Sequence, residues 1–249
     1  MRKEAWYKDW FASPYYHQLY QNRDETEAYR FISTLIQYLN PSPNSYMLDV
    51  ACGKGRHSIA LAEMGFNVTG IDLSLPSIEE AKVNETDNLH FFQHDMRLPF
   101  WVNYFDYAFN FFTSFGYFRT KREHDNAIRT IANSLKKNGV FVIDYLNVHY
   151  AENTLHSNDI TKIDDTEFHI TRWHDATHFY KQIQVIDTES FAPKHLFTEK
   201  IAKFSLGDFT EMLSYQHLQI QEVFGDYQLN SFNIKNSPRL IIIAKKHIK

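Results

Sequence analysis

The stretch from Met47 to Ser74, MLDVACGKGRHSIALAEMGFNVTGIDLS, decides the fold of this chain. The stretch begins within a short apolar run, residues 46–51, which predicts a buried strand. A loop with two glycines follows, and residues 56–64 then predict a helix that Gly65 ends. Residues 67–73 predict the next strand. A strand, a tight loop, a helix and a second strand in this order indicate a unit of a parallel sheet.

The polar groups of this loop point to a ligand at the strand ends. Gly53 and Gly55 allow the backbone to approach a ligand closely, and the helix start offers free N–H groups to an anion such as a carboxylate. Asp49 is placed to face a cationic amino group. Asp72 ends the second strand seventeen residues after Gly55, where an acid can accept hydrogen bonds from both ribose hydroxyls. A tight turn with a helix-capping aspartate is the plainer interpretation, but here all the features occur in register.

Two ligands with an adenosine part, S-adenosylmethionine and a nicotinamide dinucleotide, are the alternatives for such a loop. The fingerprint of the dinucleotide requires a third glycine three residues after the second, and this chain has Ser58 there. The negative charge of Asp49 would also repel a pyrophosphate. Both features favour S-adenosylmethionine over the dinucleotide.

Strands and helices alternate through the first part of the chain. Further helices are predicted over 24–39 with Asp24 as the N-cap, over 76–83 with Ser74 as a possible cap, and over 123–137, closed by Asn138 and Gly139. Further strands are predicted over 89–94, 104–109 and 140–146. This alternation predicts a parallel sheet with helices on both faces.

The pattern changes after about residue 150. Two-residue alternation over 168–173 and 180–186 predicts an antiparallel insertion. Ser205 and Asp208 form a predicted capping box for a helix that runs to Tyr215. Two more strands, 218–224 and 240–244, follow it.

With these features in place, the sequence resembles the class I S-adenosylmethionine-dependent methyltransferases, in particular their small bacterial members, from about Trp10 to Lys246. The matching motifs are the glycine loop 49–55, with Ala51 where the family most often has its first glycine, the strand end 70–74, the triplet 94–96, the stretch NFFTSFGYF at 110–118 and the turn 137–140. The resemblance implies an α/β fold: a Rossmann-like seven-stranded methyltransferase sheet with a final antiparallel hairpin, plus a small antiparallel β insertion after strand five.

The resemblance also implies how S-adenosylmethionine would bind. Asp72 matches the ribose position, Asp95 matches the position that bonds the adenine amino group, and Met96 would pack beside the ring. The expected cofactor-binding residues are Asp49, Ala51, Gly53, Gly55, Asp72, Leu73, Asp95, Met96, Asn110, Tyr20 and Arg23. The last two belong to the ring-rich segment 1–23, which is expected either to form a lid over the cofactor or to pack on the back of the sheet.

The methyl acceptor is expected at the carboxyl ends of strands one, four and five, where the sheet order reverses. The candidate residues there are Phe111, Ser114, Tyr117, Asp144 and Asn147. Each has a plainer interpretation, such as core packing for Phe111 and turn capping for Asp144. No catalytic residue is named, because a general base is needed only if the acceptor arrives protonated. No metal is expected, since the histidine spacings match no zinc pattern.

The composition limits the kind of partner. The formal net charge is −4 and the chain has no extended basic cluster, so nucleic acid is an unlikely acceptor. Residues 110–113 also lack the prolines of the methyltransferases that act on base amino groups. No apolar run is long enough to cross a bilayer, and residues 1–16 lack the apolar core of a signal peptide, so we expect no membrane contact and a cytoplasmic location.

We therefore predict a single methyltransferase domain over residues 1–249, with a lid segment over 1–23 and an inserted β cap over 150–206. Its predicted activity is methyl transfer from S-adenosylmethionine to an unidentified small-molecule acceptor by in-line displacement. A non-catalytic S-adenosylmethionine-binding sensor or partner subunit and an NAD-dependent oxidoreductase are the alternatives. The sequence leaves the oligomeric state open.

Overall fold

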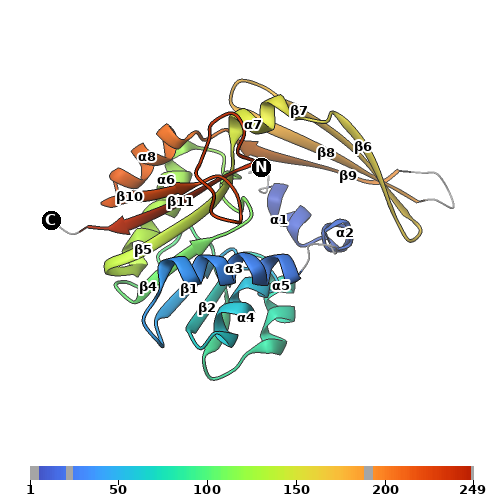
Figure 1. The fold of residues 1–249 in the computed structure, drawn as a ribbon. Coiled ribbons are helices and arrows are strands. Elements are labelled where there is room, and N and C mark those ends of the chain that lie inside the picture. Colours follow the sequence, from blue (N-terminus) through green and yellow to red (C-terminus); the bar gives the residue numbers. More distant parts are fainter. Residues whose placement is uncertain (1–5, 21–24, 188–192, 248–249) are drawn as a thin grey trace.

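The structure, a computed structural model, describes residues 6–20, 25–187 and 193–247. It contains a seven-stranded sheet and a separate four-stranded sheet that extends away from it (Figure 1). Within the described part of the chain, no helix is long and apolar enough to cross a membrane.

The seven-stranded sheet has the predicted arrangement. Its strands in chain order are β1 (Tyr46–Val50), β2 (Asn67–Asp72), β3 (Leu89–Gln93), β4 (Phe105–Asn110), β5 (Leu135–Leu146), β10 (Leu218–Phe224) and β11 (Arg239–Lys246). Their spatial order is β10-β11-β5-β4-β1-β2-β3. The first five are parallel to one another, whereas β11 is antiparallel to both β5 and β10. The predicted final antiparallel hairpin is therefore confirmed.

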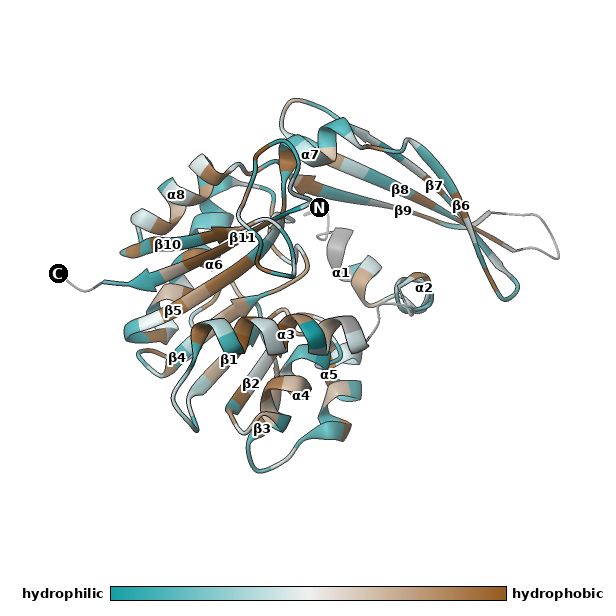
Figure 2. Ribbon diagram, in the orientation of Figure 1, coloured by the Kyte–Doolittle hydropathy of each residue, from teal (hydrophilic) through white to brown (hydrophobic). Residues whose placement is uncertain are grey.

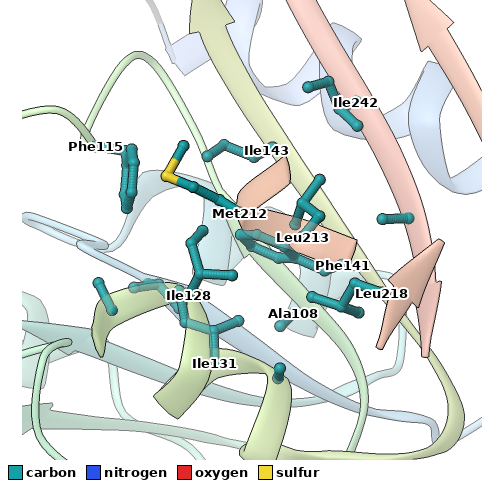
Figure 3. Packing of buried hydrophobic residues seen from close by; sticks show 14 of the residues in the cluster. Ala108, Phe115, Ile128, Ile131, Phe141, Ile143, Met212, Leu213, Leu218 and Ile242 are labelled. Carbon is teal, nitrogen blue, oxygen red and sulfur yellow. The ribbon is translucent and has the colours of Figure 1, made fainter. Parts of the chain in front are cut away.

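Helices cover both faces of this sheet and bury two hydrophobic clusters. On one face lie α3 (Glu25–Leu39), α4 (Arg56–Glu63) and α5 (Leu75–Ala81, continued by a 3-10 turn at Lys82–Asn84). On the other lie α6 (Lys121–Ser134) and α8 (Leu206–Ser214). Figure 2 shows that the central strands between them are hydrophobic, as expected for a sheet covered twice. Figure 3 shows α6 and α8 packing through Ile128, Ile131, Met212 and Leu213 onto Phe141 and Ile143 of β5.

The predicted N-terminal caps that lie within the described residues are confirmed. The Ser74 side chain caps α5, and Ser205 and Asp208 form the predicted capping box of α8. A second capping box, Thr120 with Glu123, begins α6. The predicted cap Asp24 lies outside the described residues.

The prediction that a helix extends over 123–137 is wrong at its end. The helix α6 ends at Ser134, and β5 begins at Leu135. Leu135 is buried and pairs with Phe105 of β4, after which the register shifts and Asn138 takes a left-handed φ of 62°. Sheet pairing and burial of Leu135 outweigh the helix preference of the two lysines that follow it.

The insertion after strand five is an antiparallel sheet, as predicted. A short helix, α7 (Val148–Asn153), leads from β5 into β6 (Asn158–Ile163), β7 (Thr166–His174), β8 (His178–Asp187) and β9 (Pro193–Ala202). These strands pair in sequence order, each antiparallel to the next.

The N-terminal helices α1 (Trp6–Phe11) and α2 (Pro14–Leu19) pack on this inserted sheet and not on the back of the main sheet. They form a third hydrophobic cluster, in which Trp10 is completely buried among Phe168, Ile170, Ile183 and Val185. In Figure 1 both helices lie between the inserted sheet and the main sheet. They thus reach the carboxyl ends of the parallel strands.

Candidate functional site

A cavity of about 370 Å³ lies at the carboxyl ends of the parallel strands. Its floor comes from the loops after β1, β2, β3 and β4, and its roof comes from β9 and the N-terminal helices. The position where β1 lies between β2 and β4 is the point at which the sheet order reverses, and such points bind ligands in open α/β sheets.

The glycine loop after β1 opens onto this cavity. Ala51, Gly53 and Gly55 all have left-handed φ angles, of 61°, 58° and 85°. A Cβ added to Gly53 would meet no atom within 4 Å, so the loop leaves room there for a ligand. A Cβ on Gly55 would instead lie 2.5 Å from the Phe91 ring. Gly55 is therefore needed for packing, and it does not line the cavity.

Asp72 lies at the cavity wall, where β2 ends. Its Oδ2 accepts the Gly53 N–H at 2.8 Å, and its Oδ1 accepts the Ser74 N–H at 2.8 Å. Burial raises the pKa of Asp72, and these backbone hydrogen bonds oppose that rise. Two oriented oxygens with unused lone pairs suit a pair of vicinal hydroxyls.

Asp49 lies beneath the loop and not on the cavity wall. It is 1% exposed and accepts a hydrogen bond from the Ser58 hydroxyl at 2.6 Å. Burial raises the pKa of Asp49 to about 7, although the Ser58 hydrogen bond opposes the shift. A ligand cation near the loop would favour the ionised form.

Asp95 and Met96 line the far end of the cavity, after β3. Asp95 forms a bidentate ion pair with Arg97, at 2.6 Å for the shortest contact, and Arg97 also binds Glu123. Partial burial raises the pKa of Asp95, but the hydrogen bonds from Arg97 outweigh burial, so the pKa is lowered. Asp95 thus remains an ionised acceptor.

The loop after β4 has two consecutive non-glycine residues in the left-handed region, Phe112 with φ of 54° and Thr113 with φ of 59°. Asp144 holds this conformation, because its carboxylate accepts the Phe112 N–H at 2.8 Å and its carbonyl accepts the Thr113 N–H at 3.0 Å. Arg239 donates to both Asp144 and the Thr113 hydroxyl. Strained backbone of this kind persists when its surroundings fix it, and it occurs at ligand sites.

The structure separates the predicted acceptor residues into two groups. Ser114 and Tyr117 line the cavity. The other three are buried elsewhere: Phe111 in the core, Asp144 beneath the β4 loop, and Asn147 as the N-cap of α7 with a hydrogen bond to the Ser237 carbonyl. Asn110 is also buried away from the wall, and its Nδ2 donates to the Val50 carbonyl.

The remaining predicted cofactor residues divide as well. Tyr20 and Leu73 line the cavity together with Ala51, Gly53, Asp72, Asp95 and Met96. Arg23 lies outside the described residues.

Two charged wall residues were missed from the sequence, Glu199 of β9 and Arg239 of β11. Glu199 alternates with Phe197 and Ile201 on the inward face of its strand, and an acid in an apolar register was a signal that could have found it. Arg239 stands at the first position of its strand, and the sequence contains no signal for it.

A family model described as a methyltransferase domain matches residues 41–200. The match begins before β1 and ends within β9, so it includes the glycine loop, Asp72 and nearly all of the inserted sheet.

Two curated proteins illustrate the similarity. YqeM of Bacillus subtilis, named as a methyltransferase, is 38% identical over 101 residues, which cover 39% of this chain and 41% of YqeM. The Streptomyces venezuelae enzyme dTDP-3-amino-3,4,6-trideoxy-alpha-D-glucopyranose N,N-dimethyltransferase is 32% identical over 114 residues, which cover 45% of this chain and 47% of that enzyme. The chain therefore spans less than half the length of each of these relatives.

Solved structures share the whole fold. An S-adenosylmethionine-dependent methyltransferase from Clostridium acetobutylicum superposes with a TM-score of 0.78 and 18% identity, over 96% of this chain and 98% of that chain. The sugar N-methyltransferase KedS8 from Streptoalloteichus superposes with a TM-score of 0.71 and 18% identity, over 94% and 93% of the two chains.

Proposed function

This chain belongs to the methyltransferase domain family, and we propose that it transfers a methyl group from S-adenosylmethionine to a small-molecule acceptor. One observation carries the proposal: the cavity joins a glycine loop with open space at Gly53 to the carboxylate of Asp72. This combination suits the amino acid and ribose parts of one ligand.

The residues at this end of the cavity fit the cofactor. Asp72 would accept hydrogen bonds from the ribose hydroxyls, and Asp95 would accept one from the adenine amino group beside Met96. Ala51 and Gly53 would face the methionine part, with the Asp49 carboxylate behind them. The bound cofactor supplies a methyl group on a cationic sulfur, which is a good leaving group.

The protein's own contribution is to orient the acceptor and exclude water. Phe11, Tyr16 and Tyr20 come from the N-terminal helices and form part of the cavity wall. Holding two reactants in line can supply a large part of the reduction in the barrier. Exclusion of water strengthens the electrostatic interactions inside the site.

A small acceptor is favoured by the size and the roof of the cavity. The cavity of about 370 Å³ would hold both the cofactor and the acceptor, and this volume lies at the low end of the range for sites that take small ligands, so it leaves room only for a small acceptor. The Streptomyces venezuelae relative is named for a sugar nucleotide, which is a small-molecule acceptor. A formal net charge of −4 offers little attraction to a nucleic acid backbone.

Titration calorimetry with S-adenosylmethionine tests the cofactor assignment. Asp72→Ala should weaken binding roughly 10- to 100-fold, because two hydroxyls lose a charged acceptor. Asp87→Ala, at an exposed position that does not line the cavity, should bind like the wild type. Equal affinity in both variants would show that Asp72 has no role in binding the cofactor.

Release of S-adenosylhomocysteine separates the enzyme from a non-catalytic cofactor-binding protein. We expect release to increase when a small-molecule acceptor is added to the wild type. Tight binding without acceptor-dependent release across a broad metabolite panel would favour the sensor or partner-subunit alternative.

A further inference from the structure

Among the described residues, the charged side chains on the cavity wall differ in whether they are paired with an opposite charge. In the part of the chain that the structure describes, the acidic and basic side chains on the wall are Asp72, Asp95, Glu199, Arg239 and the imidazole of His94. Asp95 is paired with Arg97, and Arg239 is paired with Asp144. Asp72 accepts two backbone N–H groups and lies at the proposed ribose position. Glu199 is then the carboxylate on the cavity wall that still has no assigned role.

Glu199 uses one oxygen to hold the N-terminal helices. It is 7% exposed, and its Oε1 accepts hydrogen bonds from Trp10 Nε1 at 2.7 Å and the Tyr20 hydroxyl at 3.0 Å. Lys181 stands opposite Glu199 on β8, but its Nζ donates to the Tyr20 hydroxyl. Among the described residues Glu199 forms no ion pair, and its Oε2 accepts no hydrogen bond. In the described part of the chain, Lys181 is linked to Glu199 only through the Tyr20 hydroxyl on Oε1, so a ligand cation in direct contact with Oε2 would stabilise the buried carboxylate further.

Glu199 lies on the acceptor side of the cavity. Two residues further along β9, Ile201 packs within 3.3 Å of the position that a Cβ on Gly116 would take, and the next residue, Ala202, donates its N–H to the Gly116 carbonyl. This end of β9 therefore rests on the loop after β4. That loop also contains Ser114 and Tyr117.

We propose that the acceptor is a primary or secondary amine and that Glu199 Oε2 binds its ammonium group. The inference rests on the proposed function and specifies its substrate class. An ammonium group would balance the charge of Glu199 and donate a charge-assisted hydrogen bond to the unused oxygen. A hydroxyl acceptor would bring no positive charge to Oε2, and Arg239 is already neutralised by Asp144.

The contact between the ammonium group and Glu199 Oε2 also provides an acceptor for the proton that the amine must lose. The ammonium group gives one proton to Glu199 Oε2, which leaves a neutral amine with a free electron pair. The amine nitrogen uses that pair to bond the methyl carbon, while the carbon–sulfur bond breaks and its electron pair stays on sulfur. The products are S-adenosylhomocysteine and a methylated ammonium ion, and Glu199 later releases its proton to water.

The test compares Glu199→Gln with Glu167→Gln. Glutamine at 199 can still accept from Trp10 and Tyr20 but carries no charge, whereas Glu167 lies on β7 of the same sheet and outside the cavity wall. Binding is measured to protein saturated with S-adenosylhomocysteine, using glucosamine against glucose, 2-aminoethanol against ethylene glycol, and glycine against glycolate. Product release from S-adenosylmethionine is measured with the same pairs.

We expect the wild type and Glu167→Gln to prefer the amino member of at least one pair in binding and in product release. Glu199→Gln should lose affinity for that amine by about tenfold or more while its affinity for S-adenosylmethionine stays unchanged. If Glu199→Gln melts at a much lower temperature, two other measurements decide the question. They are the amine preference of Glu199→Asp, which keeps the charge, and the amine preference of the wild type.

Three results would overturn the inference: no preference for the amine in any pair, unchanged amine affinity in Glu199→Gln, or a loss of S-adenosylmethionine affinity in that variant with the amine preference intact. The last result would assign Glu199 to the cofactor. Failure of the proposed function is distinct, because the wild type would then not bind S-adenosylmethionine.

Discussion

Asp49 is an acidic residue whose ionisation is strongly altered by the fold. Its carboxyl group is buried beneath the glycine loop, and burial raises its pKa to about 7. The Ser58 hydroxyl donates to it, which favours the ionised form, whereas the nearby charge of Asp72 disfavours it. The protein therefore carries a carboxyl group that changes charge near neutral pH.

This pKa predicts how stability depends on pH. Between about pH 4 and pH 7 the unfolded chain releases the Asp49 proton while the folded protein keeps it, so the free energy of unfolding falls as pH rises. The loss for this group is up to about 4 kcal/mol, at 1.36 kcal/mol for each unit of pKa shift. Asp49→Asn cannot ionise and should lack this contribution.

Urea unfolding of the wild type and Asp49→Asn between pH 4.5 and 7.5 gives the free energy of unfolding at each pH. The contribution of Asp49 is the difference between the two proteins in the slope of this free energy against pH. Buried acids that do not interact with Asp49 act equally on both proteins and cancel, whereas the coupling between Asp49 and Asp72 is part of the measured difference. Identical pH dependence of the two proteins would mean that Asp49 is ionised throughout this range.

The N-terminal helices join two parts of the molecule. Trp10 anchors α1 in the core of the inserted sheet, and its indole N–H donates to Glu199. On the other side, Phe11, Tyr16 and Tyr20 line the cavity. A ligand in the cavity would therefore contact helices that pack on the inserted sheet and, through Phe11, on Tyr117 of the loop after β4.

Hydrogen exchange tests whether these helices act as a lid. We predict that saturating S-adenosylmethionine slows amide exchange over residues 10–20, because a ligand adds contacts to one face of short helices that otherwise open easily. The helix α8 packs against β10 and outside the cavity wall, so it serves as the internal control and should not change. Equal exchange of residues 10–20 with and without the cofactor would rule out a lid.

At the scale of the whole molecule, the inserted sheet has its own hydrophobic cluster. This cluster contains residues of the inserted sheet and the N-terminal helices, whereas the two clusters of the main sheet are built mainly from its own strands and helices, with Ile201 of β9 packed against one of them. The described hydrogen bonds between the two parts include those from the Tyr145 hydroxyl to the Ala202 carbonyl and from the Ala202 N–H to the Gly116 carbonyl. The inserted sheet is thus added to a complete α/β core.

Replacing residues 158–202 by a short linker tests this division. The variant should still bind S-adenosylmethionine, because the glycine loop, Asp72 and Asp95 belong to the main sheet. It should not turn over, because the roof of the acceptor site and Glu199 are removed. Calorimetry and product release measure the two properties separately, and circular dichroism checks folding. Loss of both properties together with loss of folding would mean that the insertion belongs to the folding core.

Most of the fold could be predicted because its signals are local. The apolar run before the glycine loop, the cap at Ser74 and the capping box of Ser205 and Asp208 each act within a few residues. Alternation over 168–173 and 180–186 likewise predicted strands without knowledge of their partners. The end of α6 was mispredicted because burial and pairing of Leu135 with β4 determine it.

The sequence by itself therefore determined the order of strands and helices, the glycine loop and the acidic strand end at Asp72. Only the tertiary structure decided which charges meet at the cavity. Trp10 and Glu199 are 189 residues apart, and Arg239 and Asp144 are 95 apart, yet each pair shares a hydrogen bond. Asp144 and Asn147 became internal supports for the same reason, since their partners come from distant loops. A periodicity records which face of an element is buried, but the partner of a buried polar group depends on how distant elements pack together.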